Sequence, residues 1–198
     1  MRDGMPRVMK LSCHPSPHLA PLAWVATIPP GASAAEILHG RFVETQPGFF
    51  IEGAWAGDFA SGGLQDSDTV FGCGGTLAGG ELTFVSSTAT TDFLYYATRS
   101  HATAVSNSLP LLLATLEDAL VPGCAEYSPI NLSILEGFRH YRPAIPTLKG
   151  EVQRLMHHNL RVNRDGVTLV EKPLPPHFHD FASYRDHLQD RIGELFAN

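Results

Sequence analysis

Three stretches of the sequence carry residue types that could do chemistry. They are Cys13-His14, the loop Ser61–Ser67 (SGGLQDS), and His177, His179 and Asp180 near the C-terminal end. A cysteine made N-terminal by processing can act as a nucleophile with its own amine as base. A glycine-rich loop can hold phosphate through its backbone N–H groups. Clustered imidazoles and carboxylates can bind zinc or iron.

The flanking sequence argues against each of these uses. Pro15 and Pro17 follow Cys13 where a nucleophile would need a continuing strand. The SGGLQDS loop precedes the strand-like DTVFGCGG rather than a helix, so we expect a hairpin loop. The histidines stand in a proline-rich connector, and His157-His158 is near them only in the sequence. We therefore assign no catalytic, cofactor-binding or metal-binding residue.

The remaining candidates are expected to be structural. Cys73 lies in FGCGGT, where a core cysteine behaves as a small hydrophobe. Cys13, Cys73 and Cys124 are too scattered for a disulfide framework and predict free thiols. Tyr95 and Tyr96 are expected to pack in the core. A set of carboxylates predicts solvated helix faces: Glu117, Asp118, Asp186, Asp190 and Glu194.

Composition limits the class of protein. The chain has 198 residues, a formal net charge of −6 and 43% hydrophobic residues, which predicts one domain with a real core. The sequence has no run of basic residues, so we do not expect nucleic acid as a partner. No apolar stretch approaches the roughly 20 residues of a membrane helix, and no secretory leader is expected. We expect a cytoplasmic protein.

The expected elements are strands first and helices later. Strands are predicted at Arg7–Ser12, Leu22–Ile28, Phe49–Ala56, Asp68–Gly75, Glu81–Ser87, Phe93–Tyr96 and Ala102–Val105. Helices are predicted at Ala34–Leu38, Ser108–Leu120, Ser128–Phe138 and Phe181–Phe196. Between the last two, Glu151–Val162 and Val167–Glu171 predict a hairpin arm turning at Asp165-Gly166. This order is typical of an α+β fold.

Two runs of the sequence resemble the N-terminal glutaminase-like domain of the asparagine synthetase family. In Gly79–Ala114, Tyr95–Ala97 matches the "LYYA" of that family's hairpin, and Val105–Ser108 takes the place of "FASE" before a helix. Pro146–Gly150 stands against the family's "T.FKG", and Gln153–Leu155 against its "RRL". His157–Asn159 replaces the "PPG" turn, and the last helix resembles the one leading into the synthetase domain. The resemblance covers about Phe49 to Asn198.

The sequence departs from that family at the glutaminase site. Family members begin Met-Cys-Gly, whereas this chain begins Met1-Arg2-Asp3. The "NGEIYN" segment is missing, and Ser86–Thr91 replaces the charged "ARDRFG". The resemblance therefore implies a domain without glutaminase activity, as in the β-lactam synthetases, where the chemistry lies in a second domain opening with SGGxDS.

The resemblance implies an α+β, Ntn-hydrolase-like fold with two packed antiparallel sheets flanked by helices. We expect a loose N-terminal arm (1–21), a glutaminase-like domain (22–172) and a connector with an amphipathic helix (173–198). The expected function is structural support of an ATP-dependent amide-forming ligase domain, carried further along the chain or on a partner, with no cofactor of its own. Two alternatives stay open: a stand-alone module, as a monomer or a homodimer, that binds a small molecule or protein, and a Cys13-dependent amidohydrolase formed by processing.

Overall fold

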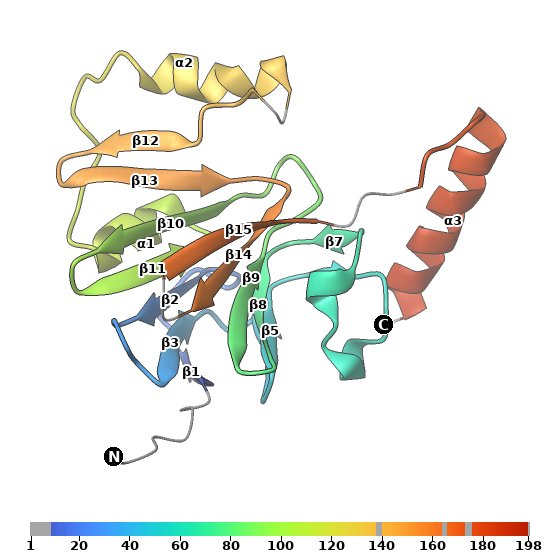
Figure 1. Ribbon diagram of the computed structural model, residues 1–198, viewed down its shortest axis with the longest axis horizontal. Helices are drawn as coiled ribbons and strands as arrows, with labels where there is room; N and C mark the ends of the chain where they lie inside the picture. Colours follow the sequence, from blue (N-terminus) through green and yellow to red (C-terminus); the bar gives the residue numbers. More distant parts are fainter. Residues whose placement is uncertain (1–8, 138–139, 164–165, 173–175, 198) are drawn as a thin grey trace, which may run out of the picture.

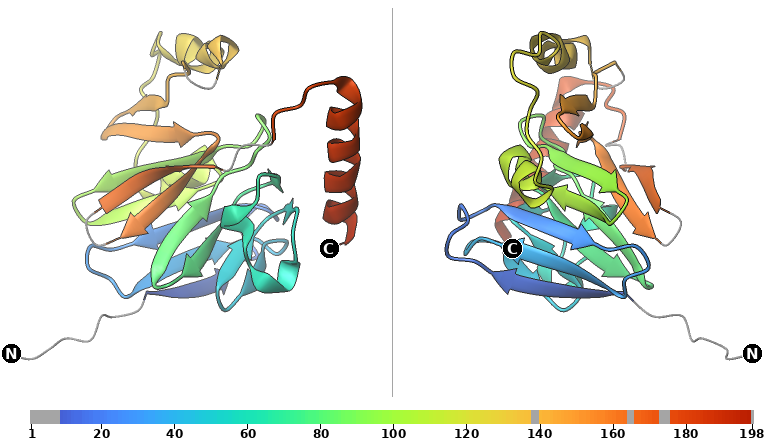
Figure 2. Two further views of the ribbon diagram at one scale, coloured as in Figure 1. Left: turned by 45° about the vertical axis from the view of Figure 1, so that its right-hand side comes forward. Right: turned by 90° about the vertical axis from the view of Figure 1, so that its left-hand side faces the viewer.

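Two β-sheets pack face to face and bury alternate side chains of their strands between them (Figures 1 and 2). The structure is a computed structural model, and it describes residues 9–137, 140–163, 166–172 and 176–197. The seven-stranded sheet runs β1 (Lys10–Pro15), β3 (Ala34–His39), β2 (Trp24–Ile28), β11 (Ala102–Ser106), β10 (Leu94–Arg99), β13 (Gly150–Leu155) and β12 (Ala144–Thr147). The six-stranded sheet runs β15 (Gly166–Glu171), β14 (His158–Asn163), β9 (Glu81–Val85), β8 (Gly74–Ala78), β5 (Phe49–Ile51) and β4 (Glu44–Gln46). Among these strands, every pairing is antiparallel except that of β1 with β3.

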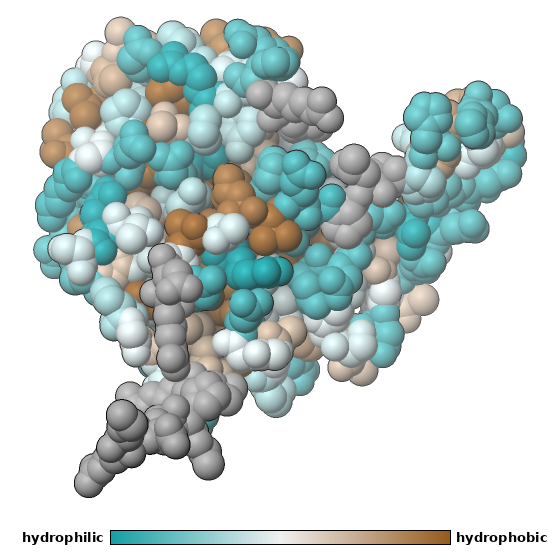
Figure 3. Space-filling model, viewed as in Figure 1, coloured by the Kyte–Doolittle hydropathy of each residue, from teal (hydrophilic) through white to brown (hydrophobic). Residues whose placement is uncertain are grey.

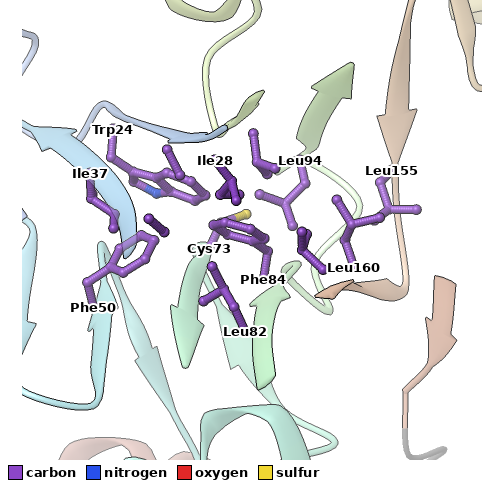
Figure 4. Packing of buried hydrophobic residues seen from close by; sticks show 14 of the residues in the cluster. Trp24, Ile28, Ile37, Phe50, Cys73, Leu82, Phe84, Leu94, Leu155 and Leu160 are labelled. Atoms are coloured by element: carbon purple, nitrogen blue, oxygen red, sulfur yellow. The ribbon is translucent and has the colours of Figure 1, made fainter. Parts of the chain in front are cut away.

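Aromatic side chains fill the space between the sheets (Figure 4). The Trp24 ring meets Phe50 edge-on, with centroids 4.8 Å apart, and stacks on Phe84 at 6.0 Å. All three residues are fully buried. Such pairs add about 0.5–1.5 kcal/mol each beyond the burial of their area. This layer therefore joins one sheet to the other.

Helix α1 (Leu109–Thr115) covers the outer face of the seven-stranded sheet. Ser108 caps it by accepting a hydrogen bond from the Leu111 N–H at 3.4 Å, as the sequence predicts. Leu112 and Leu116 are buried against the sheet. Helix α2 (Tyr127–Leu132) and the 3₁₀ turn η3 (Ser133–Glu136) follow beside β12.

Short turns rather than a helix cover the outer face of the six-stranded sheet. The hairpin of β6 (Ala54–Trp55) and β7 (Val70–Phe71) carries two 3₁₀ turns, η1 (Phe59–Ser61) and η2 (Leu64–Asp66). A third core forms beneath them, from Phe49, Ile51, Trp55, Leu64, Val70 and Val85, with Phe59 packed against it.

Helix α3 (Phe181–Ala197) stands apart from the two large sheets in Figure 1 and in the left view of Figure 2. None of its described residues is buried. No helix of the described chain is both long enough and apolar enough to cross a membrane.

The strand and helix predictions are confirmed for most of the chain. Helix 108–120 is shorter than predicted, and helix 128–138 is α2 plus η3, beginning one residue earlier; its last residue, Phe138, lies outside the described part. The predicted strands 49–56 and 68–75 are each two strands, interrupted where Gly53 passes the backbone of Phe71 and Gly72 too closely for any Cβ. The α+β class is confirmed.

Three predictions are wrong. Residues 34–38 form β3, not a helix, because alternate side chains of that segment are buried between β1 and β2. The described part of the segment 1–21 is not a loose arm. It holds the strand predicted at Arg7–Ser12, which is observed at Lys10–Pro15 with Leu11 and Cys13 packed on the main core, while Arg7 lies outside the described residues. The segment 151–162 is not one strand but two in different sheets, β13 and β14, although the predicted hairpin with 167–171 is confirmed by the antiparallel pairing of β14 with β15. Of the predicted turn, Asp165 lies outside the described residues, and Gly166 pairs with Asn163.

Candidate functional site

Polar side chains gather at one end of the sandwich, where six strand ends meet. Because neighbouring strands are antiparallel, the ends of β5, β9, β11 and β15 and the starts of β8 and β14 meet there. We name the polar residues at this place the sandwich-end cluster: Glu52, Cys73, Asn107, His157 and Lys172.

Glu52 links the two sheets within this cluster. Its Oε1 accepts a hydrogen bond from the Cys73 N–H at 2.8 Å. Asn107 also donates to the Glu52 carboxylate, while its own Oδ1 accepts from the Trp24 N–H at 3.0 Å. Burial outweighs these bonds and raises the pKa of Glu52 to about 7. The carboxyl can therefore gain or lose a proton near neutral pH.

Cys73 is a buried thiol, as the sequence predicts. It lies between the sheets beside Phe84 and Ile28 (Figure 4) and is fully buried. Burial, and after it the negative charge of Glu52, raises the pKa of the Cys73 thiol far above its ordinary value. Because the thiolate is the nucleophilic form, Cys73 is unreactive in this structure.

Lys172 is the most unusual member of the cluster. Only 6% of its surface is exposed, and its Nζ has no hydrogen-bond partner among the described residues. Burial lowers the pKa of Lys172 to about 8. Burial, and after it the nearby Lys172 charge, also lowers the pKa of the His157 imidazole. An ammonium held this way costs stability, which is typical of functional positions.

An open apolar depression adjoins the cluster through Asn107. It has a volume of about 470 Å³ and is lined by Ala20, Pro21, Leu22, Ala23, Phe42, Asn107 and Ser108. Phe42 and Leu22 are 59% and 49% exposed. The Asn107 Nδ2 that donates to Leu22 O at 2.9 Å connects this surface to Glu52. A small apolar molecule is the chemical class that such a lining would hold.

The described residues do not bring a nucleophile and a base together in catalytic geometry. Ser12 and Glu36 both contact His14, but they share its Nε2, at 2.9 and 2.7 Å. A catalytic triad uses the two ring nitrogens separately, one toward the nucleophile and one toward the carboxylate. This exposed group is therefore a surface hydrogen-bond cluster, and the sequence analysis did not foresee it.

Cys13 is poorly placed to be an N-terminal nucleophile. It lies within β1, paired with Ile37 of β3, and packs on the main core. Burial, and then the charge of Glu36, raises the pKa of its thiol. Cleavage before Cys13 would also remove the first half of β1.

The other residues singled out in the sequence lie in loops or in packed strand positions. SGGLQDS lies inside the β6–β7 hairpin, where Leu64 is buried and no helix of useful length follows. Tyr95 packs on the α1 side of its sheet and Tyr96 on the main core, both half-buried. The rings of His177 and His179 lie 5.5 Å apart, but no three potential metal ligands converge anywhere in the described ranges.

One of the carboxylates expected to be solvated is not. The Asp118 side chain is inaccessible and accepts four hydrogen bonds, two of them from the Ala119 and Lys149 N–H groups. Thr147 and Arg99 donate the other two, at 2.7 and 3.2 Å. Although burial acts the other way, these bonds lower the pKa of Asp118. Asp118 therefore ties the end of α1 to the β12–β13 turn.

Neither charged member of the sandwich-end cluster, Glu52 or Lys172, was predicted from the sequence. A single carboxylate inside the apolar run FFIEGAWA was a usable signal for Glu52. Nothing in the sequence around Lys172 marked it as buried. Comparison with known families, with curated proteins and with solved structures finds no match for this chain.

Proposed function

We propose that this chain is a non-hydrolytic, glutaminase-like domain that gives structural support to an ATP-dependent amide-forming ligase domain. The family assignment rests on the sequence resemblance, and two packed sheets with α1 directly after β11 agree with the order that the resemblance implies. The observation that carries the supporting role is helix α3, which presents an uncovered apolar stripe.

The stripe of α3 is a docking surface by its chemistry. Its members are Phe181, Tyr184, Leu188, Ile192 and Phe196, which are 75%, 44%, 43%, 43% and 88% exposed. Their spacing of three or four residues places them along one side of the helix. The ion pair to the body that the structure shows is loose, with Arg191 Nε 3.7 Å from Asp68 Oδ1. A helix with such a stripe gains most of its stability by packing against another surface.

The state of the two thiols Cys73 and Cys13 agrees with a non-hydrolytic role. Cys73 is buried and protonated, and Cys13 lies inside a strand. Neither thiol has the exposed, low-pKa environment of a catalytic cysteine.

To test this, the protein is tagged in its source cells and isolated under native conditions, and its intact mass and peptide sequences are then measured. We expect a companion domain, in the same polypeptide or a bound chain, that carries an SGGxDS-type ATP pyrophosphatase sequence. The paired variant Leu188→Glu/Ile192→Glu should release a separate partner or abolish ATP-dependent ligation. The control, Gln189→Glu at the exposed polar residue next to Leu188, should do neither. A protein of 21.5 kDa isolated without such a domain would refute the proposal.

A second function is favoured by Lys172. A buried amine without a hydrogen-bond partner in the described chain, in the same cluster as a carboxyl that titrates near neutral pH, suits a stand-alone module that binds a small molecule. Native mass spectrometry of the isolated protein tests this. A small-molecule adduct that persists in Lys149→Met and is lost in Lys172→Met supports the binding module. The absence of any adduct on the wild type counts against it.

A further inference from the structure

Strand β15 forms an unprotected sheet edge. The other three edges of the two large sheets are protected. Strand β12 contains Pro146, whose carbonyl accepts from the Tyr127 hydroxyl at 2.8 Å, and Leu120 bridges to its Thr147. Strand β4 has only three residues, and β1 carries Lys10 and ends at Pro15. Proline, lysine and short length are the usual means of blocking an edge.

Strand β15 has none of these features. It is six residues long, Gly166–Glu171, and contains no proline, lysine or arginine. Its pairing with β14 leaves the opposite row of backbone N–H and C=O groups without a neighbouring strand in the described sheet. Such a row is satisfied most directly by another extended strand.

The side chains of β15 are apolar as well as accessible. Val167 and Leu169 share the inner face of the sheet; Val167 packs on the main core, and Leu169 is 49% exposed. Figure 3 shows an apolar patch where β15 faces the viewer in Figure 1. The edge therefore offers both hydrogen-bonding groups and apolar area.

We propose that β15 pairs antiparallel with β15 of a second copy of this chain, joining the two six-stranded sheets into one. A two-fold axis at Thr168 puts Thr168 opposite its counterpart and Val167 opposite Leu169 of the second copy. This symmetry keeps the inner face of both sheets on the same side. The apolar row of one copy then continues into that of the other, and Glu171 stays outside the paired residues.

The sequence of the strand favours a second copy over a foreign strand. Both inner cross-strand pairs are apolar, the central pair is Thr–Thr, and no like charges lie opposite within 166–170. Helix α3 does not cover the edge, since it stands away from β15 in Figure 1 and in the left view of Figure 2. The proposal does not depend on the ligase-supporting role.

Sedimentation velocity over a concentration series, up to about 500 μM, tests the pairing, because a short edge interface is expected to be of micromolar strength. We expect a reversible dimer whose Kd rises at least about tenfold in Leu169→Lys, which places a charge on the apolar row. The matched control is Leu148→Lys, the same change at a side chain that is 63% exposed in the β12–β13 turn. Its Kd should match that of the wild type.

A cross-link keeps the test decisive if Leu169→Lys does not fold. In Thr168→Cys, mild oxidation should join the two introduced thiols in a disulfide between copies, identified by peptide mass mapping, while the partly exposed Cys124 stays unlinked. A monomer at all concentrations would overturn the proposal. So would a dimer that Leu169→Lys leaves intact, or one removed instead by Leu188→Glu on α3.

Discussion

Replacing Lys172 by methionine should stabilise the protein at neutral pH. The side chain is 6% exposed, its Nζ has no hydrogen-bond partner among the described residues, and its closest electrostatic neighbours are the neutral Cys73 thiol and His157. Methionine has a similar length, carries no charge and packs easily in irregular space. The substitution therefore removes the cost of burying the ammonium and keeps most of the volume.

The pKa of Lys172 sets the size and the pH range of this effect. Burial lowers it from 10.5 to about 8, and a difference of that size corresponds to about 3 kcal/mol. The cost is fully present below pH 8, where the folded and unfolded chains are both protonated. It declines between pH 8 and 10.5, where only the unfolded chain holds the proton, and it is absent above pH 10.5.

Urea unfolding at pH 7 and at pH 10 measures this dependence. We expect Lys172→Met to exceed the wild type by about 3 kcal/mol at pH 7, or roughly 6–12 °C in Tm, with a much smaller difference at pH 10. The control Lys149→Met changes an exposed lysine and should be neutral at both pH values. If Lys172→Met were less stable than the wild type at pH 7, the ammonium would have a stabilising partner, and the reasoning would fail.

Three further substitutions test other parts of the structure. The free energy of unfolding of Glu52→Gln should match that of the wild type near pH 4 and exceed it by roughly 2–3 kcal/mol above pH 7. The reason is that the raised pKa of Glu52 makes the wild type lose stability between pH 4.5 and about 7. Parallel pH profiles of the two proteins would contradict this. Asp118→Asn should cost roughly 2–4 kcal/mol at pH 7, since each carboxylate oxygen accepts two hydrogen bonds and the amide NH2 group, which cannot accept, replaces one of them. The loss should shrink below pH 3.8 as the wild type is itself protonated; a loss that stayed constant in acid would rule out the charge as its source. Ser108→Ala should lower the free energy of unfolding by about 1 kcal/mol, because α1 loses its cap. Ser100→Ala, in an exposed turn, should leave the free energy of unfolding unchanged. Equal effects of the two substitutions would argue against capping.

The elements that local patterns determine could be predicted from the sequence. Ser108 before Pro110 marks the start of α1, and it caps that helix. The three-and-four spacing of apolar residues in 181–196 predicts α3. In both segments the relevant interactions lie within a few residues of one another, so the sequence alone contains them.

The wrong predictions depend on distant partners. Residues 34–38 have good helix formers, but pairing with β1 and β2 buries Ala35 and Ile37 on one face and overrides that preference. The role of Lys10–Pro15 depends on the parallel partner β3, which no local signal identifies.

The candidate site could not be predicted for the same reason. Glu52, Cys73 and Lys172 meet because the ends of three strands of the six-stranded sheet, β5, β8 and β15, lie on the same side of that sheet, and the residues are far apart along the chain. Asp118 was expected to be solvated because its helix neighbours are polar, yet the β12–β13 turn closes over it.

Two features of this molecule are unfavourable for a domain that folds and functions without a partner. A buried ammonium without a hydrogen-bond partner in the described chain lowers stability where a methionine would raise it, and α3 holds its large apolar side chains in solvent. In natural proteins, local conflicts of this kind concentrate where function requires them. The two features also lie in different parts of the fold, and the proposals above assign them different partners, a small molecule for the amine and an apolar protein surface for the helix. A supporting domain that also senses a ligand at its sandwich end would account for both, whereas a hydrolase would account for neither.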